Sequence, residues 1–131
     1  MRDIGKYRGQ RVDNGAWVYG DLIHFPATTA IGHPDKGGVY WEEYDVIPET
    51  VGMYTGINDK NKREIYGSIP INGKMSDGGD KVKWCTLIWT IKFIDGKFGF
   101  GWKDSDHLHS QDLYIQCYHN AVEVIGHEEK P

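Results

Sequence analysis

Short apolar segments alternate with polar residues and glycines along the whole chain. The apolar segments are rich in Val, Ile, Thr, Tyr and Trp rather than in Ala, Leu and Glu, which is typical of β-strands. Seventeen glycines and five prolines separate them at short intervals. We expect strands at residues 17–23, 39–46, 50–55, 87–94, 97–102, 113–118 and 121–125. The pattern therefore predicts a mainly β protein.

The strongest local signal is the dipeptide Asp95-Gly96 between two apolar segments, 87–94 and 97–102. This dipeptide accommodates the positive φ angles of a two-residue hairpin turn. A period of two places Phe98, Phe100 and Trp102 on one face of the second strand, with Gly99 and Gly101 on the other. We expect the aromatic face in the core and a second backbone close to the glycine face.

Polar segments mark the turns. Asn14-Gly15 and residues 58–62 are predicted as exposed turns, and residues 67–79 as a longer loop. The best place for a helix is 104–111, which Asp104 or Ser105 can cap, but it holds only one or two turns. We expect residues 126–131 to be frayed.

Length and composition indicate one compact unit over residues 1–131, since a chain of this size can bury an adequate core. Five Trp, eight Tyr and four Phe predict an aromatic-rich interior. The net charge of −4 provides no overall attraction for nucleic acid. Cys85 and Cys117 have no second pair, so we expect reduced thiols. No signal peptide or membrane span is visible, and we expect a cytoplasmic protein.

Candidate chemistry is sparse. His107 and His109 share one face of an extended segment, but zinc needs a third protein ligand, and surface histidines are the simpler interpretation. Cys117 and His119 lie too close along one strand to form a nucleophile and its base. The sequence has neither a Gly-x-Ser-x-Gly elbow nor a phosphate-binding glycine loop. We therefore expect no catalytic residues, no metal and no cofactor.

One segment carries a specific motif. Residues 51–66 read Val-Gly-Met-Tyr-Thr-Gly-Ile-Asn-Asp-Lys-Asn-Lys-Arg-Glu-Ile-Tyr. This resembles the hallmark of the YopX family of phage and prophage proteins, Gly-x-Tyr-Thr-Gly-Leu-x-Asp-Lys-Asn-Gly-x-x-Ile-Tyr-Glu-Gly-Asp. Residues 1–4, 17–23 and 122–126 are also similar to the family. Two departures are visible: Lys62 replaces a glycine, and residues 67–77 interrupt the motif, which resumes at Gly78-Gly79-Asp80.

The resemblance implies a small SH3-like barrel over residues 49–131, with strands added by an N-terminal segment, 1–48. It implies no established activity, and oligomers are plausible for such proteins. For the motif itself we expect a structural role, with Tyr54 inward, Gly56 at a bend, and Asp59 with Lys60 at a hairpin tip. The motif residues are Gly52, Tyr54, Thr55, Gly56, Asp59, Lys60, Ile65, Tyr66, Gly79 and Asp80.

These observations favour a non-enzymatic accessory protein of a phage or prophage, acting in the host cytoplasm by binding another protein or another copy of itself. The candidate interaction surface comprises Tyr40, Trp41, Tyr44, Lys60, Lys62 and Arg63. The alternative is a nucleic-acid-binding SH3-like module, for which the basic residues must gather on one face. Those residues are Arg8, Arg11, Lys60, Lys62 and Arg63.

Overall fold

The computed structural model describes residues 2–102 and 107–127. Its strands are β1 (Arg2–Gln10), β2 (Trp17–His24), β3 (Thr29–Pro34), β4 (Trp41–Asp45), β5 (Gly52–Asn58), β6 (Glu64–Ser68), β7 (Pro70–Ile71), β8 (Lys74–Met75), β9 (Asp80–Trp84), β10 (Leu87–Ile94), β11 (Lys97–Gly101) and β12 (Glu123–His127). Its helices are a 3₁₀ turn, η1 (Pro48–Thr50), and α1 (Leu113–Tyr118). The prediction of a mainly β protein with one or two short helical turns is confirmed.

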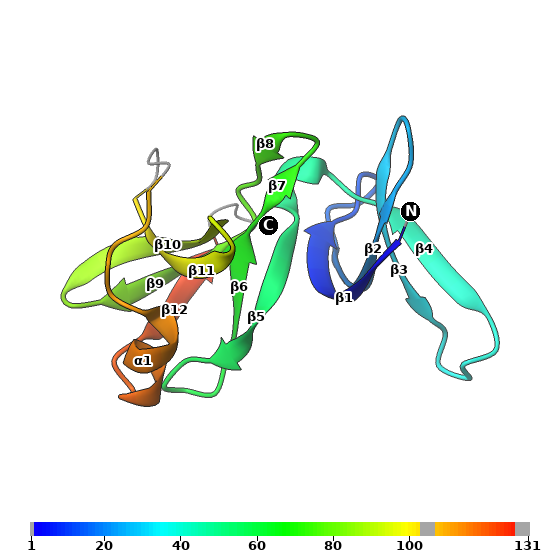
Figure 1. Ribbon diagram of the computed structural model, residues 1–131. Coiled ribbons are helices and arrows are strands. Elements are labelled where there is room, and N and C mark those ends of the chain that lie inside the picture. The colour runs from blue at the N-terminus through cyan, green and yellow to red at the C-terminus, as the bar shows by residue number, and fades with distance from the viewer. Residues whose placement is uncertain (1, 103–106, 128–131) are drawn as a thin grey trace.

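The main sheet has the strand order β12-β9-β10-β6-β5-β1-β2-β3-β4, with β11 paired to β10 (Figure 1). Its strand pairs are antiparallel except for β10 with β6, which is parallel. Among the described strands, no pairing joins the two ends of this order. The described strand pairs therefore form an open path without a closed barrel, and the SH3-like small barrel expected for residues 49–131 stays a prediction.

One cluster of buried apolar side chains extends from β12 to β3. The second half of the chain contributes fully buried side chains, among them Ile65, Val82, Ile91 and Phe100. Leu22 on β2 and Ile31 on β3 belong to the same cluster. The N-terminal strands thus complete the core that the later strands begin, because each sheet must bury its apolar face against another element.

The predicted hairpin at Asp95-Gly96 is confirmed. Both residues have positive φ, 53° and 83°, and Ile94 pairs directly with Lys97. On β11, Phe98 and Phe100 are buried. The opposite face differs from expectation: a Cβ on Gly99 would lie 2.9 Å from Cδ1 of Leu108, so a side chain rather than a second backbone covers it.

Residues 113–118, predicted as a strand, form helix α1 instead. The carboxylate of Asp112 caps the helix by accepting hydrogen bonds from the backbone N–H groups of Tyr114 and Ile115. Leu113 is buried and Cys117 is half-buried, four residues apart, whereas Ile115 is 54% exposed. The inward-facing residues thus follow the period of a helix rather than that of a strand.

Three smaller expectations concern loops. The predicted caps Asp104 and Ser105 lie outside the described residues, and Leu108 forms a β-bridge with Gly101 rather than a helical turn. Residues 126 and 127 belong to β12, while the rest of the predicted frayed end lies outside the described residues. Residues 67–79 contain the small β7–β8 hairpin, which turns at Asn72 and Gly73.

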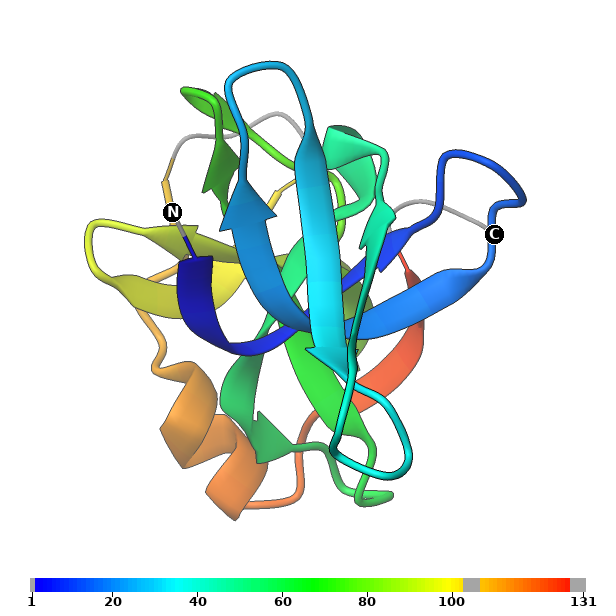
Figure 2. The same ribbon diagram turned by 90° about the vertical axis from the view of Figure 1, so that its right-hand side faces the viewer.

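The hairpin of β3 and β4 lies at one end of the sheet. We call residues 29–45, which comprise β3, β4 and the loop between them, the arm. In Figure 1 the loop of the arm extends away from the second half of the chain, and Figure 2 shows β2, β3 and β4 side by side. β4 is the terminal strand of the path and is exposed along most of its length.

Candidate functional site

The turn between β5 and β6 is organised by the motif residue Asp59, which is 5% exposed. Its Oδ1 accepts hydrogen bonds from the backbone N–H groups of Asn61 (2.9 Å) and Arg63 (2.8 Å). Its Oδ2 accepts from the backbone N–H of Val124 on β12 (2.8 Å). One carboxylate therefore shapes the turn and attaches it to the edge of the sheet, 65 residues away in the chain.

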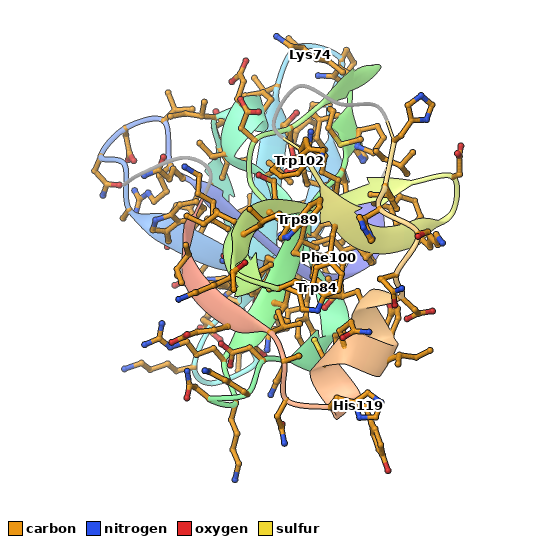
Figure 3. The ribbon with its side chains drawn as sticks, turned by 90° about the vertical axis from the view of Figure 1, so that its left-hand side faces the viewer. Lys74, Trp84, Trp89, Phe100, Trp102 and His119 are labelled. Atoms are coloured by element: carbon orange, nitrogen blue, oxygen red, sulfur yellow. The ribbon has the colours of Figure 1, made fainter. Side chains whose placement is uncertain are left out.

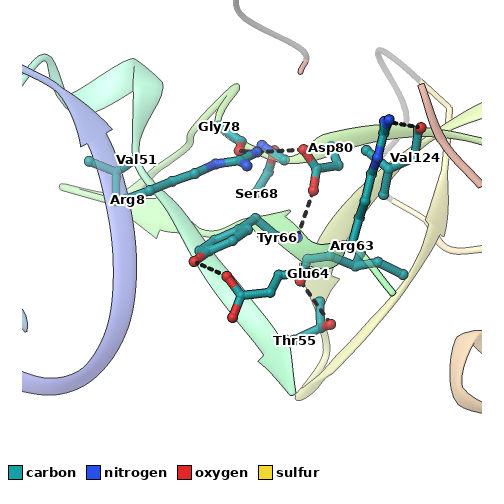
Figure 4. Close-up of polar contacts among 12 residues, drawn as sticks. Arg8, Val51, Thr55, Arg63, Glu64, Tyr66, Ser68, Gly78, Asp80 and Val124 are labelled. Carbon is teal, nitrogen blue, oxygen red and sulfur yellow. Dashed lines mark hydrogen bonds and ion pairs between the residues drawn. The ribbon is translucent and has the colours of Figure 1, made fainter. Parts of the chain in front are cut away.

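A second buried carboxylate, Asp80, joins the two halves of the chain (Figure 4). Its Oδ1 lies 2.7 Å from Nη2 of Arg8 on β1, and its Oδ2 accepts from the backbone N–H of Tyr66 on β6 (2.9 Å). The side chains of Arg8 and Asp80 are 3% and 1% exposed. Nη2 of Arg8 also donates to the backbone carbonyl of Gly78 (2.9 Å). The ion pair is fully buried and hydrogen-bonded, so removing either partner leaves a charge without compensation.

The ring of Tyr66 completes this buried cluster. The guanidinium of Arg8 lies 4.3 Å from its ring centre, a cation–π distance. Burial, and then the neighbouring carboxylate of Glu64, raise the pKa of the Tyr66 phenol above its ordinary range. Tyr66 therefore remains a neutral phenol that donates a hydrogen bond to Glu64 (3.2 Å).

The other motif residues also serve the packing of β5 against β6. A Cβ on Gly52 would lie 2.5 Å from the carbonyl oxygen of Gly78, so only glycine fits there. Oγ1 of Thr55 donates to the carbonyl of Ile65 (2.9 Å), and Ile65 is fully buried. Tyr54 is half-buried against Tyr66, and Gly56 has a φ of 90°. We call Arg8, Asp59, Tyr66 and Asp80, with the backbone groups that they bind, the motif frame.

The aromatic residues of the candidate surface lie on the arm, away from this frame. Tyr40 is 73% exposed and Trp41 is 39% exposed. The indole of Trp41 covers Gly32, where a Cβ would lie 2.5 Å from the ring, and the ring of Tyr44 stacks on the guanidinium of Arg11 at 4.2 Å. Acidic residues alternate with these rings: Glu42, Glu43 and Asp45 are all exposed.

The hydrogen-bond pattern shows which backbone groups of β4 point outward. Asp35 donates to Tyr40 and Val46 donates to Thr29, so the even-numbered residues 40, 42, 44 and 46 bond toward β3. The odd-numbered residues direct their N–H and C=O groups to the outer side of the sheet. The carbonyl of Asp45 accepts there from Val12 (3.0 Å). Among the described strands, none pairs with β4 on this side.

A cavity of about 300 Å³ opens where the arm meets the turn after β1. It is lined by Arg11, Val12, Asp13, Glu43, Tyr44 and Asp45. Arg11 and Asp13 form a two-pronged ion pair at 2.6 and 2.9 Å. The hydrogen bond from Arg11 is the main cause that holds the pKa of Asp13 below its usual value. Since Arg11 is paired with Asp13, Glu43 and Asp45 leave the cavity lining with a negative balance of charge.

The basic half of the candidate surface lies elsewhere. We call residues 59–63, between β5 and β6, the tip; its Lys60, Lys62 and Arg63 are exposed. Lys60 lies 3.5 Å from Glu123, and Arg63 donates to the carbonyl of Val124 (3.3 Å). Lys62 stands at the apex with a φ of 65°. Figure 1 shows the tip and the loop of the arm far apart, so the candidate residues form two separate surfaces rather than one.

The basic residues required by the nucleic-acid alternative do not gather on one face. Arg8 is buried in the motif frame, and Arg11 is paired with Asp13 at the base of the arm. Only Lys60, Lys62 and Arg63 remain together, at the tip.

His107 and His109 are both exposed, and His109 contributes to an aromatic cluster instead of a ligand set. Its ring packs edge-on against Trp84 (5.3 Å) and Trp89 (5.2 Å). In the part of the chain that the structure describes, no group of three or more potential ligands that could hold a metal ion is found. Figure 3 shows Trp102, Trp89, Phe100 and Trp84 following one another. Trp84, Trp89 and Phe100 belong to β9, β10 and β11, and Trp102 follows β11.

Sequence reasoning missed two features. The partnership of Arg8 with Asp80 spans 72 residues and has no local signal. The acidic character of the arm was visible, however, because residues 41–45 read Trp-Glu-Glu-Tyr-Asp. Within the described residues, no helix is long and apolar enough to cross a membrane.

Residues 6–128 match the family described as YopX protein, which covers nearly the whole chain. No curated protein and no solved structure matches the chain. The chain therefore belongs to the YopX family, as the motif of residues 51–66 indicated.

Proposed function

We propose that this YopX-family chain is a non-enzymatic accessory protein, of phage or prophage origin, that binds proteins through its arm in the cytoplasm of a bacterial host. The observation that supports the proposal is the terminal strand β4. It presents outward-directed backbone groups beside exposed aromatic side chains, which is the geometry by which a sheet edge accepts a further strand.

The negative charge of the arm indicates which class of protein partner it fits. Glu42, Glu43 and Asp45 flank the aromatic rings, so a partner segment with Lys or Arg side chains gains ion pairs and cation–π contacts there. Such rim contacts give specificity and faster association more than affinity. The partner class that best fits the arm is therefore a protein with an exposed basic segment.

Site-specific photo-crosslinking in bacterial cells tests the proposal. A photoreactive phenylalanine analogue replaces Tyr40 on the arm, and the control carries it at Tyr118 on α1, which is 84% exposed. We expect a discrete protein adduct from position 40 that Glu42→Lys/Glu43→Lys abolishes, and none from position 118. Equal adducts from both positions, or none from position 40, contradict the proposal.

Nucleic acid is the alternative partner, and the basic tip is the feature that favours it. A module of that kind binds DNA or RNA with an affinity that falls steeply as salt rises, and Lys62→Asp weakens the binding. Binding that Glu42→Lys/Glu43→Lys leaves unchanged identifies the tip, and not the arm, as the functional surface.

A further inference from the structure

The arm and the tip carry opposite charges and lie apart on one molecule. Glu42, Glu43 and Asp45 make the outer edge of β4 acidic, whereas Lys60, Lys62 and Arg63 make the tip basic. Lys83 is also exposed beside the tip, where it shares a cavity lining with Lys60 and Glu123. Figure 1 shows the tip and the loop of the arm both at the lower edge of the view but well apart from side to side, so one copy does not bring them together.

Two arms are a poor match for each other. An antiparallel pairing of β4 with β4 of a second copy, centred on Glu43, sets Glu43 opposite Glu43. It also places Asp45 of each copy diagonal to Glu43 of the other. Like charges directly opposite each other on paired strands are destabilising. The acidic side chains thus protect this sheet edge against symmetric pairing, while leaving it suited to a basic surface.

The tip carries an exposed lysine that can enter the cavity at the base of the arm. Lys62 is exposed and lies at the apex of a turn whose backbone is fixed by the carboxylate of Asp59. The cavity of about 300 Å³ at the base of the arm is lined by Glu43 and Asp45, by the Arg11–Asp13 ion pair and by Val12, which is 62% exposed, so its lining is acidic on balance. An extended lysine can place its apolar stem along Val12 and its ammonium against the carboxylates.

We propose that the chain associates with itself head to tail, with the tip of one copy docked on the arm of the next and Lys62 in the cavity between Val12 and Asp45. This inference deepens the proposed function and rests on it, since it names a second copy as the partner of the arm. A heterologous contact of this kind leaves one arm and one tip unused in every dimer, so the assembly grows into a ring or a chain. Its ionic contacts are exposed, so salt weakens it.

Light scattering after size exclusion measures the association. We expect the apparent mass of the unmodified protein to rise at least twofold with concentration at about 0.02 M salt and to return to the monomer at about 1 M, where charges are screened beyond roughly 3 Å. Glu42→Lys/Glu43→Lys blocks the arm and Lys60→Gln/Lys62→Gln blocks the tip by leaving it neutral, so each variant alone is a monomer.

Mixing the two variants is the decisive step. The arm variant retains its tip and the tip variant retains its arm, so the mixture forms dimers of one copy each and nothing larger. Glu49→Lys/Asp77→Lys is the matched control: it makes the same change in charge at exposed positions near η1 and associates like the unmodified protein. Urea unfolding midpoints verify that all three variants fold.

Two results overturn the inference. A tip variant that associates like the unmodified protein shows that the tip is not the partner, and a monomer at every concentration shows that no second copy binds. If the protein is a monomer while position 40 still crosslinks to a different protein, the inference fails and the proposed function stands. If position 40 gives no adduct of any kind, both fail.

Discussion

The motif frame and the arm use the same kinds of side chain in opposite ways. In the frame, the carboxylates of Asp59 and Asp80 are buried and their oxygens accept hydrogen bonds from named partners. On the arm, Glu42, Glu43 and Asp45 are exposed and line a sheet edge. The difference teaches that the segment with the clearest family signal builds the fold, while the surface available to partners has a less distinctive sequence.

The largest effect is expected from the ion pair of the frame. Asp80→Ala leaves the guanidinium of Arg8 buried without its partner and removes the acceptor of the Tyr66 N–H, which costs about 3–5 kcal/mol of unfolding free energy. Urea denaturation measures the loss. The control is Asp13→Ala, which breaks the exposed pair with Arg11 and leaves the urea midpoint nearly unchanged, because surface ion pairs contribute little. Equal losses in the two variants contradict the contrast between frame and arm.

The next effect compares two carboxylates that shape turns. Asp59→Ala leaves the buried backbone N–H of Val124 without an acceptor and costs about 1–3 kcal/mol. Asp35, in the loop of the arm, accepts in the same way from Val39 and Tyr40, but there water can replace the lost carboxylate. Asp35→Ala therefore costs less, at most about 1 kcal/mol. A larger loss for Asp35→Ala in the same denaturation series argues against burial as the cause.

The two cysteines are expected to react at different rates, and the rate of Cys117 depends on Asp59 of the frame. Burial, and then the negative charge of Asp59, raise the pKa of Cys117 to about 11. The thiol stays protonated at neutral pH, so its alkylation by iodoacetamide accelerates only as the pH approaches that value. Cys85 is exposed in the β9–β10 turn and reacts first. Asp59→Asn removes the anion that opposes thiolate formation, so mass spectrometry detects faster alkylation of Cys117. An unchanged rate excludes that electrostatic effect.

The smallest effect on stability is expected on the arm. Tyr40→Ser removes an exposed ring that contributes little to the core, so the unfolding free energy changes by no more than about 0.5 kcal/mol. The same variant weakens association in light scattering, because Tyr40 lies beside the acidic edge. A loss of stability above that range shows that the ring is structural.

The turns illustrate how much of the fold the sequence predicts. Asn72-Gly73 and Asp95-Gly96 have positive φ at both residues, as Asn-Gly and Asp-Gly pairs predict. Cys85 and Thr86 adopt the same conformation, with φ of 56° and 64°, although a β-branched residue is unfavourable there. The pairing of β9 with β10 imposes that turn, since Trp84 and Leu87 are paired across it. Tertiary structure therefore outweighs local preference.

The same limit applies to α1 and to the site. Leu113, Ile115 and Cys117 alternate with more polar residues and suggest a strand, whereas the cap at Asp112 is the signal that favours a helix. For the site, single residues such as Tyr40 and Lys62 could be identified as exposed from their context. Their separation onto two surfaces could not be predicted, because it follows from the order of the strands. The burial of Arg8 in the core could not be predicted either.

Hydrogen–deuterium exchange at low and high protein concentration tests the central claim most directly, because it observes the frame, the arm and the tip in one sample. We predict that the backbone amides of residues 41–45 and 60–63 gain protection as concentration rises at low salt, while that of Tyr66, bound to Asp80, exchanges slowly and equally at both. Protection that appears elsewhere while the arm and the tip stay unchanged contradicts the account.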